Sequence, residues 1–506
     1  MSSQPVLLAG QWRDAQAAGT FHAHHPATGE PLAETFPVSA WADCDAALNA
    51  AAAAAESLRA TPPEQLAKFL TRFAERLEAR KTELVETAHA ETALPKAPRL
   101  ADVELPRTTN QLRQAAAAAL DGAWALPMID AKLNIRSMLA PVGPVLCLGP
   151  NNFPFAYNGV AGGDFAAAIA AGNPVIAKAH PSHPRTSQLL AEAAFAAVTE
   201  TGLPAATVQM LYQMSPADGL RMVADKRLGA VGFTGSRAAG MQLKAAADAV
   251  GKPIYLEMSS INPVLILPGA LAERGEKIVE EFCGSCLMAS GQFCTSPGLV
   301  ILFAGADAEK FVSGVKAKLE AATPSVLLSS GVAQNLAAGV KALQDAGAEL
   351  VTGGTPLAGN KFANTLLRVS GEKFLASPEK LQTEVFGNAS LVVVVRDAAQ
   401  AAEMLSHLEG NLTGAIYSDT LGADDALYET LSPSLRQRVG RLLNDKMPTG
   451  VAVTAAMNHG GPFPATGHPG FTAVGFPAAM RRFAMLQCFD NVRPHRLPVA
   501  LRDKKL

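Results

Sequence analysis

The sequence is poor in cysteine and in the large aromatic residues: its 506 residues include six cysteines, three tryptophans and five tyrosines. Six cysteines are too few for a disulfide scaffold, and such sparing use fits a reducing compartment. The start of the chain, residues 1–11, lacks the basic and then apolar pattern of a secretory signal peptide. We therefore expect a cytoplasmic protein.

The chain also lacks an excess of charge and lacks long apolar runs. Its 43 basic and 45 acidic residues leave a formal net charge of −2, which gives no indication of a nucleic-acid or membrane-surface partner. The alanine run at residues 50–55 is too short to cross a bilayer and has acidic residues on both sides. We expect no nucleic-acid partner and no membrane span.

Metal-binding patterns are missing as well. None of the ten histidines belongs to an HExxH or similar motif, so we expect no metal. Cys283 and Cys286 have CxxC spacing, but no second CxxC and no histidine pair at ligand spacing completes a zinc site. We interpret these two cysteines as core positions of a helix.

The central part of the chain has the pattern of a parallel sheet. Short apolar runs alternate there with alanine-rich helical segments, which is typical of βαβ units. We expect strands at 145–148, 174–177, 208–211 and 230–233, and helices at 163–171, 187–201, 219–225 and 237–250. This pattern predicts an α/β fold with a doubly wound sheet, which binds ligands at the carboxyl ends of its strands.

The flanking segments are expected to add helices before this sheet and a second α/β region after it. We expect extended hairpins at 5–40, helices at 42–58, from 62, at 81–91 and at 104–121, and a strand at 135–140. After residue 257 we expect strands near 264–267, 299–303 and 391–395, and helices at 273–286, 308–321 and 399–408. The end of the chain is rich in glycine and proline up to Pro477 and then strand-like.

The stretch Gly291-Gln-Phe-Cys294-Thr295 is the most informative for chemistry. Cys294 follows a glycine turn and a segment, 284–290, that is expected to be helical. A thiolate is a strong nucleophile near neutral pH. A single cysteine is more often a small buried side chain, so the interpretation of Cys294 as a nucleophile depends on further motifs.

Two other polar residues lie at or just after the ends of expected strands. Asn152 follows the strand at 145–148, and its amide could face a reacting carbonyl oxygen, although a turn asparagine is the plainer interpretation. Glu257 ends an apolar run and could activate water as a general base. A strand-end glutamate on the surface is the alternative.

A dinucleotide site is indicated by two further segments. Lys178 ends an expected strand and could meet ribose hydroxyls or a phosphate, or could be a solvated charge. The turn at Gly235-Ser236 opens an expected helix, whose first unpaired N–H groups suit a phosphate. The turn is not GxGxxG, and a plain strand–helix turn fits it equally well.

Together these motifs resemble those of the aldehyde dehydrogenase superfamily, in order and spacing, from about residue 6 to residue 498. They are Asn152-Phe-Pro, Lys178, Phe233-Thr-Gly-Ser236, Glu257-Met-Ser-Ser260, Gly291-Gln-Phe-Cys294 and Glu384-Val-Phe-Gly387. The resemblance implies NAD(P)-dependent oxidation of a small-molecule aldehyde to its carboxylic acid. A CoA-acylating dehydrogenase or an ester or thioester hydrolase that uses the same cysteine is the alternative.

The resemblance also implies roles for single residues. Cys294 would attack the aldehyde to give a thiohemiacetal and then a thioester, while the Asn152 amide would hold the oxyanion and Glu257 would activate the water. The cofactor-binding residues would be Lys178 at the adenosine ribose, Gly235 and Ser236 at the pyrophosphate, and Glu384 and Phe386 at the nicotinamide riboside.

Departures from the family pattern bear on the cofactor. Many NAD-using members carry a carboxylate shortly after the strand-end lysine, but residues 179–184 read Ala-His-Pro-Ser-His-Pro. A carboxylate would repel a 2′-phosphate, so its loss predicts NADP over NAD, with Lys178, His180 or Arg185 adding attraction.

A narrower likeness concerns the branch that contains fatty aldehyde, α-ketoglutaric semialdehyde and aromatic-pathway semialdehyde dehydrogenases. Residues 161–164 and 178–181 and the segment His459-Gly-Gly-Pro-Phe-Pro464 carry it. The likeness implies that His459 lines the active site and tunes Cys294 or the bound water. A loop histidine bonded to backbone is the alternative.

The same resemblance implies the architecture. The expected parts are a Rossmann-like cofactor domain at 1–126 and 141–256, an α/β catalytic domain at 257–464, a returning loop at 465–482, and a small β oligomerisation element at 127–140 and 483–506. The two segments of this element are expected to pair across a subunit boundary. Family members form dimers or tetramers, so we expect a homodimer or homotetramer.

Overall fold

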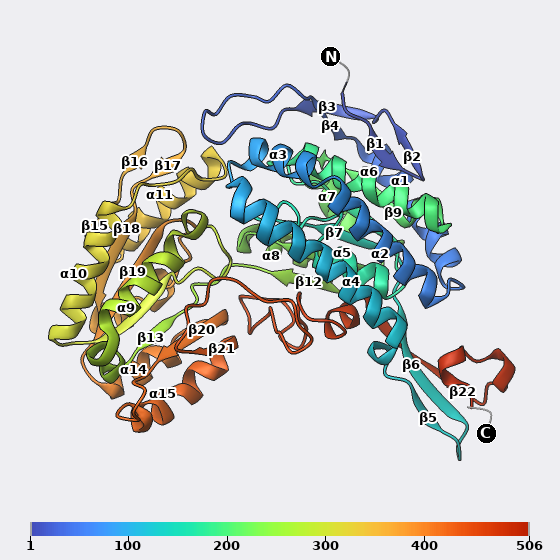
Figure 1. Ribbon diagram of the computed structural model, residues 1–506. Helices are drawn as coiled ribbons and strands as arrows, with labels where there is room; N and C mark the ends of the chain where they lie inside the picture. Colours follow the sequence, from blue (N-terminus) through green and yellow to red (C-terminus); the bar gives the residue numbers. More distant parts are fainter. Residues whose placement is uncertain (1–2, 504–506) are drawn as a thin grey trace.

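The computed structural model describes residues 3–503, which form two seven-stranded sheets, a three-stranded sheet on a projecting arm, and smaller hairpins (Figure 1). The first large sheet has the order β12-β11-β7-β8-β9-β1-β2. Its strands are β1 (Val6–Leu8), β2 (Gln11–Arg13), β7 (Val145–Leu148), β8 (Val175–Lys178), β9 (Val208–Leu211), β11 (Ala230–Thr234) and β12 (Ile254–Glu257). The five strands from β12 to β9 are parallel, as the alternating pattern predicts.

The helices on this sheet begin and end close to the predicted residues. They are α1 (Trp41–Leu58), α2 (Pro63–Ala79), α3 (Lys81–Thr92), α4 (Leu105–Asp121), α5 (Gly163–Ala170), α6 (Pro184–Thr201), α7 (Pro216–Val223) and α8 (Arg237–Asp248). In α2, the apolar residues at helical spacing, Phe69, Leu70 and Phe73 among them, are fully buried. Pro63 opens this helix, where a missing N–H leaves no hydrogen bond unmade.

The second large sheet has the order β15-β18-β19-β14-β13-β20-β21. Its strands are β13 (Val264–Ile266), β14 (Leu299–Phe303), β15 (Glu349–Thr352), β18 (Thr365–Ser370), β19 (Ala389–Val395), β20 (Asn411–Tyr417) and β21 (Val439–Asn444). The surrounding helices are α9 (Pro268–Leu287), α10 (Ala306–Ala321), α11 (Ser330–Asp345), α12 (Gly371–Ala376), α13 (Pro378–Leu381), α14 (Ala398–Ser406) and α15 (Asp425–Arg438). Cys283 and Cys286 are buried in α9, as predicted for core positions.

The arm is a three-stranded antiparallel sheet that projects from the body of the protein beside the C-terminal segment (Figure 1). It contains β5 (Met128–Asp130), β6 (Ile135–Pro141) and β22 (Ala484–Asp490), with β6 in the centre. The two segments expected to form a small β element therefore pair with each other within one chain, and their pairing across a subunit boundary stays a prediction. Large apolar side chains on it are exposed: Met128, Ile129, Leu133, Met485 and Leu486.

The remaining strands form two small sheets, β10-β4-β3 and β16-β17. They are β3 (Ala17–Phe21), β4 (Phe36–Ser39), β10 (Gln213–Met214), β16 (Pro356–Leu357) and β17 (Lys361–Phe362). Within residues 3–503, no helix has the length and apolar character needed to cross a membrane. The predicted α/β fold class is confirmed, and the predicted domain boundaries stay a prediction.

Candidate active site

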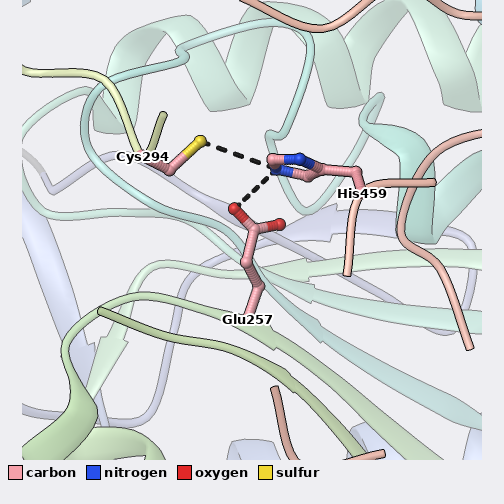
Figure 2. A group of neighbouring side chains, drawn as sticks. All are labelled: Glu257, Cys294 and His459. Atoms are coloured by element: carbon pink, nitrogen blue, oxygen red, sulfur yellow. Dashed lines mark hydrogen bonds and ion pairs between the residues drawn. The ribbon is translucent and has the colours of Figure 1, made fainter. Parts of the chain in front are cut away.

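Three chemically reactive side chains from distant segments point toward one another (Figure 2). Glu257 is the last residue of β12, Cys294 follows α9, and His459 lies in the long loop before β22. The Nε2 atom of His459 is 2.8 Å from Oε1 of Glu257 and 3.5 Å from Sγ of Cys294. The position of Glu257 agrees with the rule that parallel sheets bind ligands at the carboxyl ends of their strands.

The backbone before Cys294 departs from the predicted helix at 284–290, which is wrong beyond Leu287. Helix α9 ends there, and Ala289, Ser290 and Gly291 have φ values of 47°, 56° and 69°. Such left-handed conformations end a helix. A Cβ atom on Gly291 would lie 2.1 Å from the carbonyl oxygen of Gly387, so only glycine fits. This close approach fixes the loop that carries the thiol.

Two asparagine side chains hold the same loop. Nδ2 of Asn152 donates to the carbonyl oxygen of Gln292 over 3.0 Å, and Nδ2 of Asn262 donates to the carbonyl oxygen of Cys294 over 2.9 Å. Asn152 is buried, which separates it from an ordinary turn asparagine. Its amide has a second hydrogen that this bond does not use. The structure therefore brings Asn152 to the cysteine loop with one donor left for a ligand.

The thiol is held in its neutral form by its surroundings. Burial raises the pKa of Cys294 well above its ordinary value, and the nearby Glu257 carboxylate raises this pKa further. A neutral thiol is a weak nucleophile, so its proton must be removed by a base before it attacks a carbonyl. Glu257 has a buried Oε2 atom without a hydrogen-bond partner among the described residues, and this oxygen is available to a thiol or a water.

His459 is fixed by contacts that the sequence motifs do not reveal. Its backbone N–H donates to Oγ1 of Thr472 over 2.7 Å. The centre of the Tyr157 ring lies 5.8 Å from the centre of the imidazole ring. The Tyr157 hydroxyl accepts a hydrogen bond from Arg107 over 3.1 Å. Neither a tyrosine after a strand nor an arginine in a helix stands out in a sequence, so reasoning from motifs missed both.

The residues expected at the adenosine end of a dinucleotide lie at the carboxyl end of β8. Nζ of Lys178 donates to the carbonyl oxygen of Ala179 over 3.3 Å, and burial lowers the pKa of this lysine to about 8. His180 follows, and burial together with the neighbouring His183 lowers its pKa. Arg185 is paired with Glu192 over 3.3 Å, which reduces the charge that it could offer to a phosphate.

The expected phosphate turn joins β11 to α8. The Ser236 hydroxyl accepts from the backbone N–H of Ala239 and so caps the helix, while the Gly235 N–H donates to the carbonyl oxygen of Glu257 over 3.1 Å. This second bond connects the turn directly to the strand that carries Glu257.

Glu384 and Phe386 line a pocket together with Ser260, Gly291 and Phe293. The pocket therefore borders the cysteine loop from the side of the second sheet. Burial raises the pKa of Glu384 to about 7, although hydrogen bonds from Ser259 and Ser260 act in the opposite direction. Glu384 thus lies where it could meet a ribose, apart from the group around His459.

Cys294, Glu257 and His459 also have the donor types of a metal site, and their ligand atoms lie within 4.8 Å of one another. The sequence gives no metal motif, and the expectation of no metal stays a prediction. The same three side chains, which are a thiol, a carboxylate and an imidazole, can exchange a proton with one another.

A cysteine beside a carboxylate and an imidazole, set against a Rossmann-like sheet, indicates an oxidoreductase that uses a covalent cysteine intermediate. The profile of the aldehyde dehydrogenase family matches residues 12–439. The chain belongs to this family, and the protein is an aldehyde dehydrogenase, as the motifs indicate.

Two relatives are similar over nearly their whole length. "Alpha-ketoglutaric semialdehyde dehydrogenase 2" of Azospirillum brasilense is 40% identical, with 98% of this chain and 96% of the relative aligned. "Alpha-ketoglutaric semialdehyde dehydrogenase" of Acinetobacter baylyi is 35% identical, with 97% and 94% aligned.

Solved structures support the fold. 1-Pyrroline-5-carboxylate dehydrogenase from Thermus with bound NAD has a TM-score of 0.81 at 22% identity, covering 96% of this chain and 92% of that one. The aldehyde dehydrogenase family uses NAD or NADP.

Proposed function

We propose that the enzyme oxidises an aldehyde to its carboxylic acid with NADP and water, through a thioester on Cys294. The observation that carries the proposal is the meeting of the Cys294 thiol, the Glu257 carboxylate and the His459 imidazole around one point. Loss of the thiol proton allows the sulfur to attack the aldehyde carbon, and the negative charge then develops on the former carbonyl oxygen.

In this proposal the free hydrogen of the Asn152 amide and the Cys294 backbone N–H stabilise that oxygen. The cofactor supplies the oxidation by accepting a hydride. Glu257 then removes a proton from water, the water oxygen bonds to the thioester carbon, and the carbon–sulfur bond breaks to release the acid and the Cys294 thiolate. His459 positions the Glu257 carboxylate and exchanges protons with it.

The residues around Lys178 fit NADP. Burial lowers the pKa of Lys178, and among residues 3–503 this lysine forms no ion pair with a carboxylate. A 2′-phosphate would supply the missing negative charge. Gly235 and Ser236 would meet the pyrophosphate, and Glu384 and Phe386 would hold the nicotinamide riboside. His180 would line the phosphate site as a hydrogen-bonding group, because burial disfavours its charged form.

The aldehyde is proposed to be a semialdehyde or a long-chain aldehyde, in line with the two relatives named for α-ketoglutaric semialdehyde. Coenzyme A as acyl acceptor is less well supported, because Glu257 is close enough to the thiol to activate water there. Simple ester hydrolysis is less well supported because the chain belongs to the aldehyde dehydrogenase family. We further propose a homodimer or homotetramer that covers the exposed apolar residues of the arm, and a cytoplasmic location.

The test is to measure the absorbance of NADPH with a panel of short, long-chain, aromatic and oxo-acid aldehydes, with NADP and with NAD. Replacing Cys294 by alanine should abolish turnover and leave cofactor binding intact. Absence of NADPH with every aldehyde, or equal efficiency with NAD, would contradict the respective part of the proposal.

A further inference from the structure

Two arginines near the thiol have no acidic partner among the residues that the structure describes. Arg107, in α4, and Arg441, in β21, are both partly buried, and among residues 3–503 neither lies within ion-pair distance of a carboxylate. Other deeply buried arginines here have one: Arg99 pairs with Glu104, and Arg482 pairs with Asp164 over 2.7 Å. Because a buried charge is costly unless an opposite charge compensates it, two such exceptions at one site require an explanation.

Arg107 lies on the aromatic wall beside His459. Its guanidinium carbon is 5.1 Å from the centre of the Tyr157 ring and 5.8 Å from that of Phe153, and one terminal nitrogen donates to the Tyr157 hydroxyl over 3.1 Å. Its Nε atom is buried without a hydrogen-bond partner among the described residues. The rings fix the plane of the guanidinium, and several donors remain for a ligand.

Arg441 approaches the same place from the second sheet. One terminal nitrogen donates to the carbonyl oxygens of Pro448 and Gly450 over 2.9 and 3.0 Å, and the other contacts Sδ of Met457 over 3.8 Å. Met457 is two residues from His459, and the Nε atom of Arg441 is also buried without a described partner. Both guanidinium groups lie within electrostatic range of Cys294.

We infer that Arg107 and Arg441 bind a carboxylate at the far end of the aldehyde substrate, so that the enzyme takes ω-oxo acids and releases dicarboxylates. This inference rests on the proposed function and names its substrate class. A substrate carboxylate would supply the missing counter-charge, and the planar guanidinium groups match its geometry. A neutral long-chain aldehyde would bury both cations beside an apolar chain, which is unfavourable.

The surroundings of the two arginines differ. Burial lowers the pKa of Arg441, whereas at Arg107 burial is outweighed by Tyr157, Glu104 and Cys294, which raise the pKa of this arginine. The guanidinium stays charged at any pH at which the enzyme is folded. The charges could instead stabilise the Cys294 thiolate alone, and the experiment must separate the two effects.

The experiment compares 5-oxopentanoate with its methyl ester, which differ in charge at the far end. We expect the wild type to prefer the acid, and Arg107→Gln and Arg441→Gln each to lower kcat/KM for the acid by about 10- to 100-fold, as for loss of a charged hydrogen bond. The ester should change far less, and Arg107→Lys and Arg441→Lys should restore part of the loss. Arg113→Gln is the matched control, because Arg113 lies on α4 and is paired with Glu78.

Binding of glutarate to Cys294→Ala gives a measurement without turnover. Glutarate should raise the melting temperature of this variant, and the added Arg107→Gln or Arg441→Gln change should remove that rise. An ester oxidised as well as the acid, or equal losses for both substrates in the arginine variants, would overturn the assignment and leave the proposed function intact. Absence of NADPH with both aldehydes would instead overturn the proposed function.

Discussion

The Nε2 atom of His459 stands between the Glu257 carboxylate at 2.8 Å and the Cys294 sulfur at 3.5 Å. A ring nitrogen carries at most one hydrogen, and a carboxylate oxygen is a stronger acceptor than sulfur, so a hydrogen on Nε2 belongs to the bond with Glu257. The carboxylate is thereby oriented with its other oxygen free. In the proposed mechanism, His459 is thus a positioning residue that sets where Glu257 can act.

The first prediction is that His459→Ala lowers kcat by about 10- to 100-fold, because an unpositioned general base loses part of its contribution. The pH dependence of kcat should also change, because the hydrogen bond to Glu257 is lost. Steady-state rates from pH 6 to pH 9 measure both effects. His407→Ala, at an exposed histidine, is the control. An unchanged rate with an unchanged pH profile would remove His459 from the mechanism.

The second prediction concerns the thiol in Glu257→Gln. Burial and the Glu257 charge both raise the pKa of Cys294, so removal of that charge should lower it and increase the thiolate fraction at a given pH. The pH midpoint of alkylation by iodoacetamide should therefore fall. Glu349→Gln, at an exposed glutamate, should leave the midpoint unchanged.

Turnover by Glu257→Gln should fall at the same time, because no base activates the water that cleaves the thioester. We expect a rapid burst of about one NADPH per subunit followed by a slow steady state, the kinetic sign of an accumulated acyl-enzyme. Slower alkylation would mean that Glu257 serves mainly as the base for the thiol. A linear time course without a burst would mean that water attack is not its task.

The first sheet could be predicted from sequence because its strands are buried on both faces and read as continuous apolar runs. Strand β20 of the second sheet was missed because it begins with polar residues. Asn411 and Thr413 are buried there, and the Asn411 side chain accepts from the backbone N–H of Ile261 over 2.9 Å. Such polar positions are explained by partners about 150 residues away, which local patterns cannot supply.

In the candidate site, too, some residues could be predicted from local sequence motifs and others only from their contacts in the fold. Cys294, Glu257 and Asn152 belong to short motifs, so their importance could be inferred before their convergence was visible. Tyr157 and Arg107 belong to no motif, and their role follows only from where the fold places them. The local sequence predicts a helix for the left-handed residues after α9, because alanine and serine give no local sign of that conformation.

The third prediction tests this turn with two glycines seven residues apart. Gly291→Ala places a methyl group 2.1 Å from a backbone oxygen at a φ of 69°, so the cysteine loop must shift. The loop movement that relieves this contact should lower kcat by about 100-fold and should also lower the melting temperature. Gly284→Ala is the matched control, because nothing lies within 4 Å of its Cβ and alanine favours the helix. Wild-type activity in Gly291→Ala would show that the glycine turn is dispensable.

The fourth prediction is a pH dependence of cofactor choice that comes from Lys178. Burial lowers the pKa of this lysine to about 8, so its charge is present below that pH and is lost as the pH rises above it. The KM for NADP should therefore increase from pH 7 to pH 9, with the midpoint moved above 8 in the complex because a phosphate favours the charged lysine. The KM for NAD should change less, since NAD has no 2′-phosphate.

Lys178→Met should raise the KM for NADP by about 10-fold at pH 7 and flatten its pH dependence, whereas Lys310→Met, on the surface, should do neither. Equal effects of Lys178→Met on both cofactors would assign the lysine to the ribose they share and would leave NADP preference without this support.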